Sequence, residues 1–110
     1  MENANAVTDN KAERRFELPL GEGQTAFVQY EAAGEGALAL MHTEVPEGYE
    51  GRGVGAKLIE GAFQILQAGN LKIIPTCSFV AAYLRRHPQY QSLVANETRG
   101  GGVTSVPEAD

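Results

Sequence analysis

The chain has 110 residues, 43% of them hydrophobic and 21% charged, which is typical of one globular domain. Nine Lys and Arg residues against fourteen Asp and Glu residues give a net charge of −5 at pH 7, which argues against a nucleic-acid-binding surface. The single cysteine, Cys77, excludes an internal disulfide, and no apolar run reaches the roughly 18 residues of a membrane helix. Because residues 1–15 lack the apolar core of a signal peptide, we expect a cytoplasmic protein that binds no membrane.

The first half of the chain alternates between apolar and polar residues. Residues 1–12 are polar and are predicted to form a disordered tail. Apolar residues at every second position then predict strands over about 15–20, 25–32 and 37–45. Pairs of glycines between these segments are typical of turns. Three strands joined by short turns predict an antiparallel meander.

The second half changes to the period of a helix. Apolar residues recur at helical spacing at Leu58, Ile59, Ala62, Phe63 and Leu66. They predict a helix from about 53 to 68, followed by a short buried strand over 71–74. A second helix is predicted to end at His87, because Pro88 disfavours helix at the residue before it. Its expected apolar face carries Phe79, Val80, Tyr83 and Leu84.

The predicted fold class is therefore α+β. We expect a mixed, mostly antiparallel sheet with one parallel, right-handed β-α-β crossover and two main helices. Residues 96–110 contain few apolar side chains and are predicted to be a second disordered tail, so the folded domain is expected over 13–95.

Four glycines crowd between the third strand and the first helix, at Gly48, Gly51, Gly53 and Gly55. Glycine lets a backbone curl tightly and lets a ligand approach its amides, and the free N–H groups of a helix start suit a phosphate. A tight turn alone needs only one glycine, so this segment predicts an anion-binding loop. The P-loop pattern is excluded because 56–58 reads Ala-Lys-Leu. The dinucleotide fingerprint is excluded because 71–74 lacks the required carboxylate.

A third pattern fits the loop better. A strand, then Arg-Gly-Val-Gly-Ala over 52–56, then an amphipathic helix, a strand and a helix resemble the GNAT superfamily of acetyl-CoA-dependent N-acetyltransferases. The general motif of that superfamily is Gln/Arg-x-x-Gly-x-Gly/Ala, and Glu50 departs from it at the first position. Segments 42–46 and 75–80, together with His87-Pro88, resemble a short single-domain branch. The resemblance covers about half of the chain, from Leu38 to Tyr90.

The resemblance implies that backbone amides of the loop bind the pyrophosphate of coenzyme A. The cofactor-binding residues that it implies are Val45, Gly51, Arg52, Gly53, Val54, Gly55, Ala56 and Lys57. It also implies that the strand ending at Val45 and the strand near Ile73 splay apart to admit pantetheine, and that backbone N–H near Val45 polarises the thioester. Larger members carry extra N-terminal helices for which this chain has no room, so we expect an open acceptor site.

The catalytic candidates each have a structural alternative. His42 and Glu44 share one face of a strand and could relay a proton, or could be ordinary exposed polar residues. Cys77 begins the second helix, where a thiol pKa is lowered, so it could carry an acetyl group or protonate the leaving thiolate. Its alternative is a small buried apolar residue. Tyr83 matches the region where the superfamily places an acid, but core packing is the favoured interpretation.

We therefore expect an N-acetyltransferase that moves an acetyl group from acetyl-CoA to an amine, directly in a ternary complex rather than through an acyl-Cys77 intermediate. The alternative is a non-catalytic CoA-binding sensor or protein-interaction module. No metal ion is expected, and the protein is expected to be a monomer or weak dimer.

Overall fold

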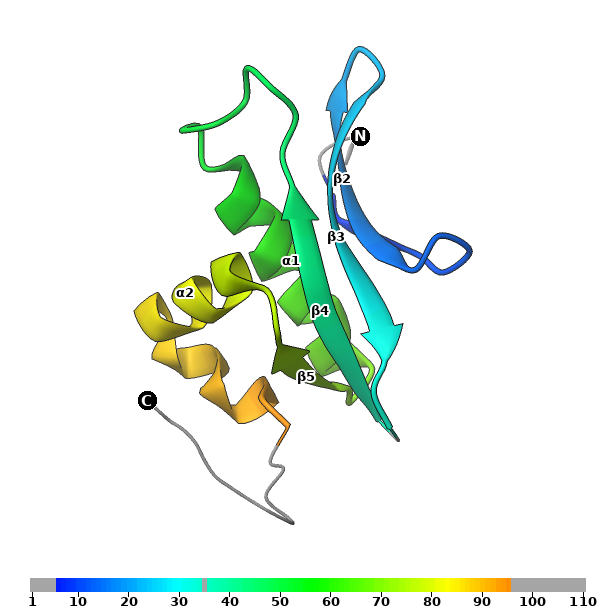
Figure 1. Ribbon diagram of the computed structural model, residues 1–110, viewed down its shortest axis with the longest axis vertical. Helices are drawn as coiled ribbons and strands as arrows, with labels where there is room; N and C mark the ends of the chain where they lie inside the picture. The colour runs from blue at the N-terminus through cyan, green and yellow to red at the C-terminus, as the bar shows by residue number, and fades with distance from the viewer. Residues whose placement is uncertain (1–5, 35, 96–110) are drawn as a thin grey trace.

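The computed structural model describes residues 6–34 and 36–95, which form one five-stranded sheet with helices. The strands, in sheet order, are β1 (Thr8–Asn10), β2 (Arg15–Gly21), β3 (Gln24–Ala32), β4 (Ala37–Glu44) and β5 (Lys72–Pro75). The helices are α1 (Val54–Ala68), α2 (Ser78–Arg86) and the 3₁₀ helix η1 (Pro88–Leu93). Strands β1 to β4 pair antiparallel with their neighbours. β4 pairs directly and in parallel with β5, and α1 connects these two strands along the chain (Figure 1). The predicted α+β fold with its meander and crossover is confirmed.

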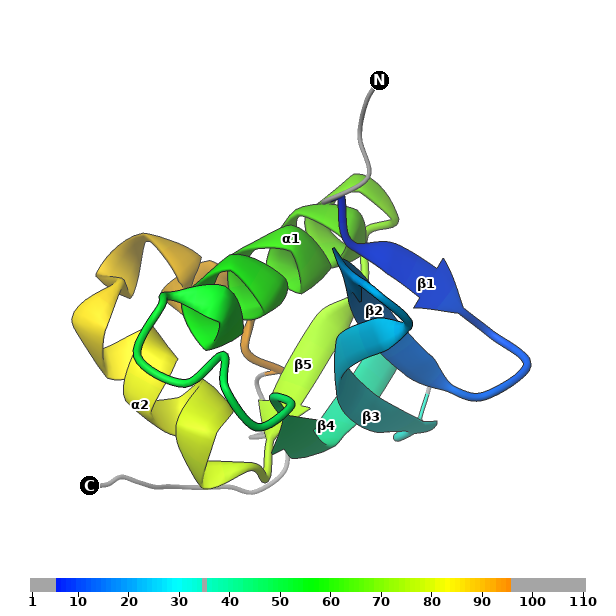
Figure 2. The same cartoon turned by 90° about the horizontal axis from the view of Figure 1, so that it is seen from above.

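The core lies between the sheet and α1. Figure 2 shows α1 over one side of the sheet with α2 beside it. The five apolar residues that predicted α1 are all fully buried. They pack against the inward residues of the strands, which include Phe16, Leu18, Val28 and Leu40. Figure 1 views the opposite face, which we call the open face, with β4 in front of α1.

A β-bulge at Met41 changes which side chains of β4 face the core. Gln29 of β3 pairs with His42 and Tyr30 pairs with Leu40, so Met41 is an extra residue between them. Since strand side chains alternate, one extra residue shifts the phase of the rest. Leu40 is fully buried and Met41 is 44% exposed on the open face. Beyond the bulge, Thr43 therefore returns to the core side.

The strands β4 and β5 part beyond Leu40. The last paired residues are Leu40 and Pro75, but β4 continues to Glu44. The carbonyl of Leu40 instead accepts hydrogen bonds from the Thr76 hydroxyl at 2.8 Å and the Cys77 N–H at 2.9 Å. These bonds turn the chain out of the sheet and into α2. The divergence of the two strands agrees with the expectation for this position.

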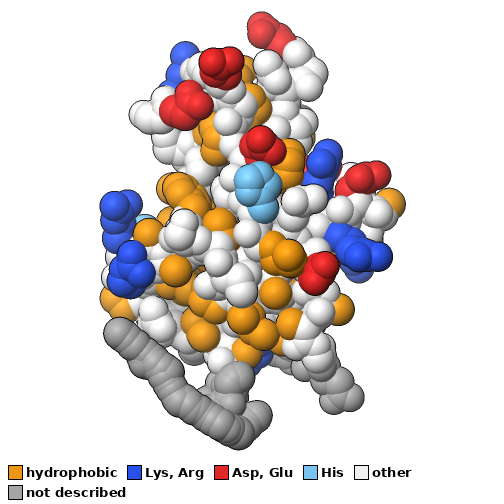
Figure 3. Space-filling view, in the orientation of Figure 1, with side chains coloured by type: hydrophobic (Ala, Val, Ile, Leu, Met, Phe, Trp, Pro, Cys, Tyr) orange, Lys and Arg blue, Asp and Glu red, His pale blue; other side chains and the backbone are white. Residues whose placement is uncertain are grey.

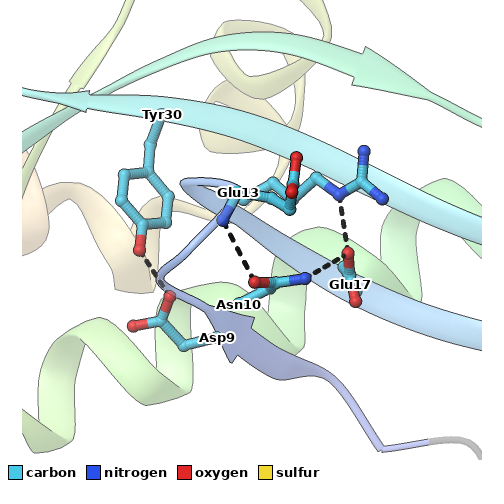
Figure 4. A network of polar contacts seen from close by, with 6 residues as sticks. Asp9, Asn10, Glu13, Glu17 and Tyr30 are labelled. Atoms are coloured by element: carbon cyan, nitrogen blue, oxygen red, sulfur yellow. Dashed lines mark hydrogen bonds and ion pairs between the residues drawn. The ribbon is translucent and has the colours of Figure 1, made fainter.

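The N-terminal segment differs from its prediction. Within the described part of residues 1–12, Thr8–Asn10 forms β1 and pairs with β2. The Tyr30 hydroxyl donates a hydrogen bond to the carboxylate of Asp9. Asn10 bonds to Glu17 at 3.0 Å and accepts a bond from the backbone of Glu13 at 3.1 Å (Figure 4). A disordered tail is wrong for this segment, because tertiary contacts order residues that have no apolar pattern of their own. Residues 1–5 and the predicted tail 96–110 lie outside the described residues.

The second helical region also departs from expectation. Phe79 is 43% exposed rather than buried, and the core side of α2 consists of Val80, Tyr83 and Leu84. The chain then continues in η1, which the sequence pattern did not predict and which buries Tyr90. Phe79 is displaced from the core because it packs on α1 near its start, as described below.

Candidate active site

The loop between β4 and α1 curls as the glycine pattern predicts. Gly48, Gly51 and Gly53 have φ angles of 92°, 78° and 76°, a region that other residues rarely adopt. Gly53 is the N-cap of α1, and among the described residues α1 has no side-chain cap and no acidic residue in its first turn. The N–H groups of this turn therefore lack a capping side chain and carry the positive end of the helix dipole.

Two cavities adjoin this loop and share Tyr49, Gly53 and Val54 in their walls. The first, of about 230 Å³, is lined by the cations Arg52 and Lys57 together with Leu18 and Leu20. The second, of about 330 Å³, is mostly apolar apart from Glu50, and its other walls are Val45, Gly51, Gly55, Ala56 and Phe79. The guanidinium of Arg52 lies 5.3 Å from the centroid of the Tyr49 ring. All eight residues expected to bind the cofactor thus line one or both of two adjoining cavities, one cationic and one apolar.

Cys77 lies at the point where β4 and β5 part, as the N-cap of α2. Its side chain is nearly buried, and its sulfur lies 3.3 Å from the hydroxyl oxygen of Thr43. Burial raises the pKa of the Cys77 thiol. The contacts with Thr43 and with the backbone at Val80 and Phe79 together lower it by more, so the pKa is below its ordinary value. This environment favours a thiolate more than bulk water does.

His42 and Glu44 share a face of β4, as predicted from their spacing. The Nε2 atom of His42 lies 3.5 Å from Oε1 of Glu44, and both side chains are 57% exposed. The space-filling view of the open face shows a histidine beside an acidic side chain (Figure 3). Because Thr43 and Cys77 are on the core side of the strand, the structure does not bring His42 and Glu44 together with Cys77.

Tyr83 lies in an aromatic cluster between α1, α2 and η1. Its ring stacks on His87 at 4.0 Å between centroids and meets Phe63 edge-on at 5.6 Å. Burial raises the pKa of Tyr83, and the Glu60 carboxylate and Tyr90 raise it further. These contacts are those of a core side chain, which is the interpretation that the sequence favours.

Thr43 and Phe79 reach the site without having been predicted to do so. The position of a bulge is not visible in an alternating pattern, so Thr43 had no signal that would place it beside Cys77. For Phe79 the sequence does offer a signal, which is the glycine at position 55, because a glycine in the first turn of a helix can leave room for a group that approaches closely.

Within residues 6–34 and 36–95, no helix is both long enough and apolar enough to cross a membrane. In the same residues no group of three or more His, Cys, Asp or Glu side chains is arranged to hold a metal ion.

The fold and the loop define the class of protein. The chain belongs to the GCN5-related N-acetyltransferase family, whose model matches residues 15–93. It is similar to protein NATD1 of Danio rerio, with 34% identity over 87 residues that cover 76% of this chain and 79% of the relative. It is also similar to NATD1 of Homo sapiens, with 33% identity over 88 residues that cover 79% and 78%. The solution NMR structure of a GCN5-like protein from Staphylococcus aureus has a TM-score of 0.65 at 25% identity and covers 94% of both chains.

Proposed function

We propose that this protein binds acetyl-CoA at the loop before α1 and transfers the acetyl group to an amine. The observation that carries the proposal is the position of all eight expected cofactor residues along two adjoining cavities. Family membership supports the same function. Acetyl-CoA, when bound, supplies an acetyl group activated as a thioester.

The cationic cavity fits the phosphate groups of the cofactor. Arg52 and Lys57 contribute positive charge beside the first turn of α1, whose N–H groups also attract anions. At Gly51 and Gly53 the space where a Cβ would lie is open, with no atom within 4 Å. A ligand can therefore approach the backbone closely at both positions. The apolar cavity beside Val45 suits the uncharged arm of the cofactor.

Acyl transfer requires a neutral amine to attack the thioester carbonyl, the C–S bond to break and the departing sulfur to gain a proton. In our proposal the backbone N–H of Val45, at the end of β4, polarises the carbonyl. Cys77 lies where β4 and β5 part and is the residue that we assign to hold the proton for the departing sulfur. The proton that the amine releases as the N–C bond forms is taken up by His42 or Glu44 when the amine arrives from the open face.

Direct transfer is our favoured route. The Cys77 side chain is only 9% exposed and is held by Thr43, which limits its access to a carbonyl carbon. An acetyl-Cys77 intermediate is the less favoured route. The two are distinguished by Cys77→Ala: the covalent route predicts complete loss of transfer, while the direct route predicts a slower reaction that persists.

A specific observation supports a second candidate, a CoA-binding module without catalysis. His42 and Glu44 lie on one face of β4, Cys77 lies on the other, and Tyr83 is part of the core. The described residues therefore do not assemble an acid and a base at one point. A module would bind the cofactor and leave it intact.

Two measurements on the full chain separate these functions. Isothermal titration with acetyl-CoA is expected to show one-to-one binding, and absence of binding would contradict both candidates. Release of free CoA thiol in the presence of mixed small amines and lysine peptides then reports transfer. Release above the uncatalysed rate supports the enzyme, and binding without release supports the module.

A further inference from the structure

Phe79 is a large hydrophobic side chain that stays 43% exposed at the start of α2. In the described part of the chain, Met41, at 44%, is the other large hydrophobic side chain exposed to this degree. Met41 lies in the bulge of β4 on the open face, whereas Phe79 forms a wall of the apolar cavity with Val45 and Val54. The exposed surface of Phe79 therefore falls at the proposed cofactor site.

The ring of Phe79 packs directly on the first turn of α1. A Cβ atom added to Gly55 would lie 2.6 Å from Cζ of Phe79, closer than such atoms can come. Gly55 is not among the residues with positive φ, so its role is to leave space rather than to permit an unusual backbone. Because Gly55 has no side chain, the aromatic ring of Phe79 can lie beside the anion-binding loop.

Phe79 also lies next to the other end of the site. It is the second residue of α2, and the N-cap of that helix is Cys77. Phe79 therefore lies between the start of α1, which its ring contacts, and Cys77, which precedes it by two residues. The ring is a wall of the apolar cavity at the loop, so a ligand with its anionic end at the loop and its reacting end near Cys77 would lie along it. Covering the ring with an uncharged segment removes apolar surface from water, which favours binding.

We propose that Phe79 is a specificity-determining residue of the cofactor site, where its ring contacts the uncharged arm between the phosphates and the sulfur of the cofactor. The inference rests on the proposed function. It separates the two ends of the ligand: Arg52, Lys57 and the loop bind the phosphates, and Phe79 distinguishes a ligand that carries the arm from one that lacks it.

The test compares CoA with ADP, which has the pyrophosphate but no arm, by isothermal titration and by competition between the two. For Phe79→Ala we expect about tenfold weaker binding of CoA, or about 1.4 kcal/mol, with binding of ADP changed less than about twofold. Phe79→Leu retains an apolar side chain and is expected to keep most of the affinity for CoA. Met41→Ala is the matched control, equally exposed but on the open face, and is expected to change neither ligand.

The outcomes separate this inference from the proposed function. If the unmodified protein binds neither ligand, the proposed function fails and the inference fails with it. If it binds CoA and Phe79→Ala weakens both ligands equally, or neither, the inference alone is overturned. A second readout needs no variant: nuclear Overhauser contacts between the Phe79 ring protons and the arm of bound CoA are expected, and their absence contradicts the inference.

Discussion

The hydroxyl oxygen of Thr43 lies 3.3 Å from the sulfur of Cys77 and joins the end of β4 to the start of α2. The contact exists because the bulge at Met41 turns Thr43 to the core side. Beyond the point where β4 and β5 part, this contact between side chains bridges β4 and the start of α2. The contact is also one of the causes that lower the pKa of the thiol, which makes it testable.

Thr43→Val replaces the hydroxyl with a methyl group of similar size. Burial raises the pKa of Cys77 and the hydrogen bonds lower it, so removing one bond is expected to raise the pKa towards its ordinary value. Ultraviolet absorbance of the thiolate against pH measures this shift, with Cys77→Ser as the blank. Thr25→Val, on β3, is the control and is expected to leave the titration unchanged. An unchanged titration in Thr43→Val would show that the hydroxyl does not govern the thiol.

Arg52→Gln removes one cation from the wall of the smaller cavity. We expect binding of CoA to weaken about tenfold, which corresponds to about 1.4 kcal/mol. Because the contact is between charges, the difference from the unmodified protein is expected to shrink as salt is raised. Arg85→Gln, on the exposed surface near the end of α2, is the matched control. Equal losses in the two variants would point to net charge rather than to this cavity.

Two substitutions of Tyr83 distinguish a packing role of this residue from a catalytic one. Tyr83→Phe keeps the ring that stacks on His87 and meets Phe63, so stability and any acetyl transfer are expected to stay close to those of the unmodified protein. Tyr83→Ala removes a buried ring and is expected to cost about 3–5 kcal/mol in free energy of unfolding. Urea denaturation and the CoA-release assay measure the two effects. Loss of transfer in a stable Tyr83→Phe protein would instead identify the hydroxyl as an acid.

The bond from Tyr30 to Asp9 holds β1 on the sheet. Tyr30→Phe is expected to lower the free energy of unfolding by about 1.5–3 kcal/mol at neutral pH, because the acceptor is charged. Burial and Asp9 raise the pKa of Tyr30 to about 12, from 10.0. The unfolded chain therefore loses this proton first, and the stability from Tyr30 declines as pH rises from about 10 towards 12. Urea denaturation from pH 8 to 11 should show a shallower decline in Tyr30→Phe; equal slopes would contradict this linkage.

Local sequence patterns predicted most helices and strands. The features that they did not predict, such as β1 and the position of Phe79, depend on tertiary contacts. The apolar spacing from Leu58 to Leu66 predicted α1 because a helix buries one face. β1 could not be predicted, since Thr8–Asn10 has no apolar pattern and is ordered by its pairing with β2 and by Tyr30. The position of Phe79 depends on a contact with Gly55 that is distant in sequence.

In the candidate site, too, some features were predictable from local sequence and one was not. The loop was predictable because Gly51 and Gly53 require a backbone that other residues rarely adopt. The shared face of His42 and Glu44 followed from the period of a strand. The pairing of Thr43 with Cys77 did not, since it depends on a bulge that shifts that period by one residue.

The central claim is that the loop and the first turn of α1 bind coenzyme A. Amide chemical shifts of the nitrogen-15-labelled protein, followed during addition of CoA, test it most directly. We predict that the largest changes fall on the amides of Gly51, Gly53, Val54, Gly55 and Ala56, with smaller changes at Val45 and Phe79 and none along β1. Saturable changes centred elsewhere, or no changes at all, would contradict the account.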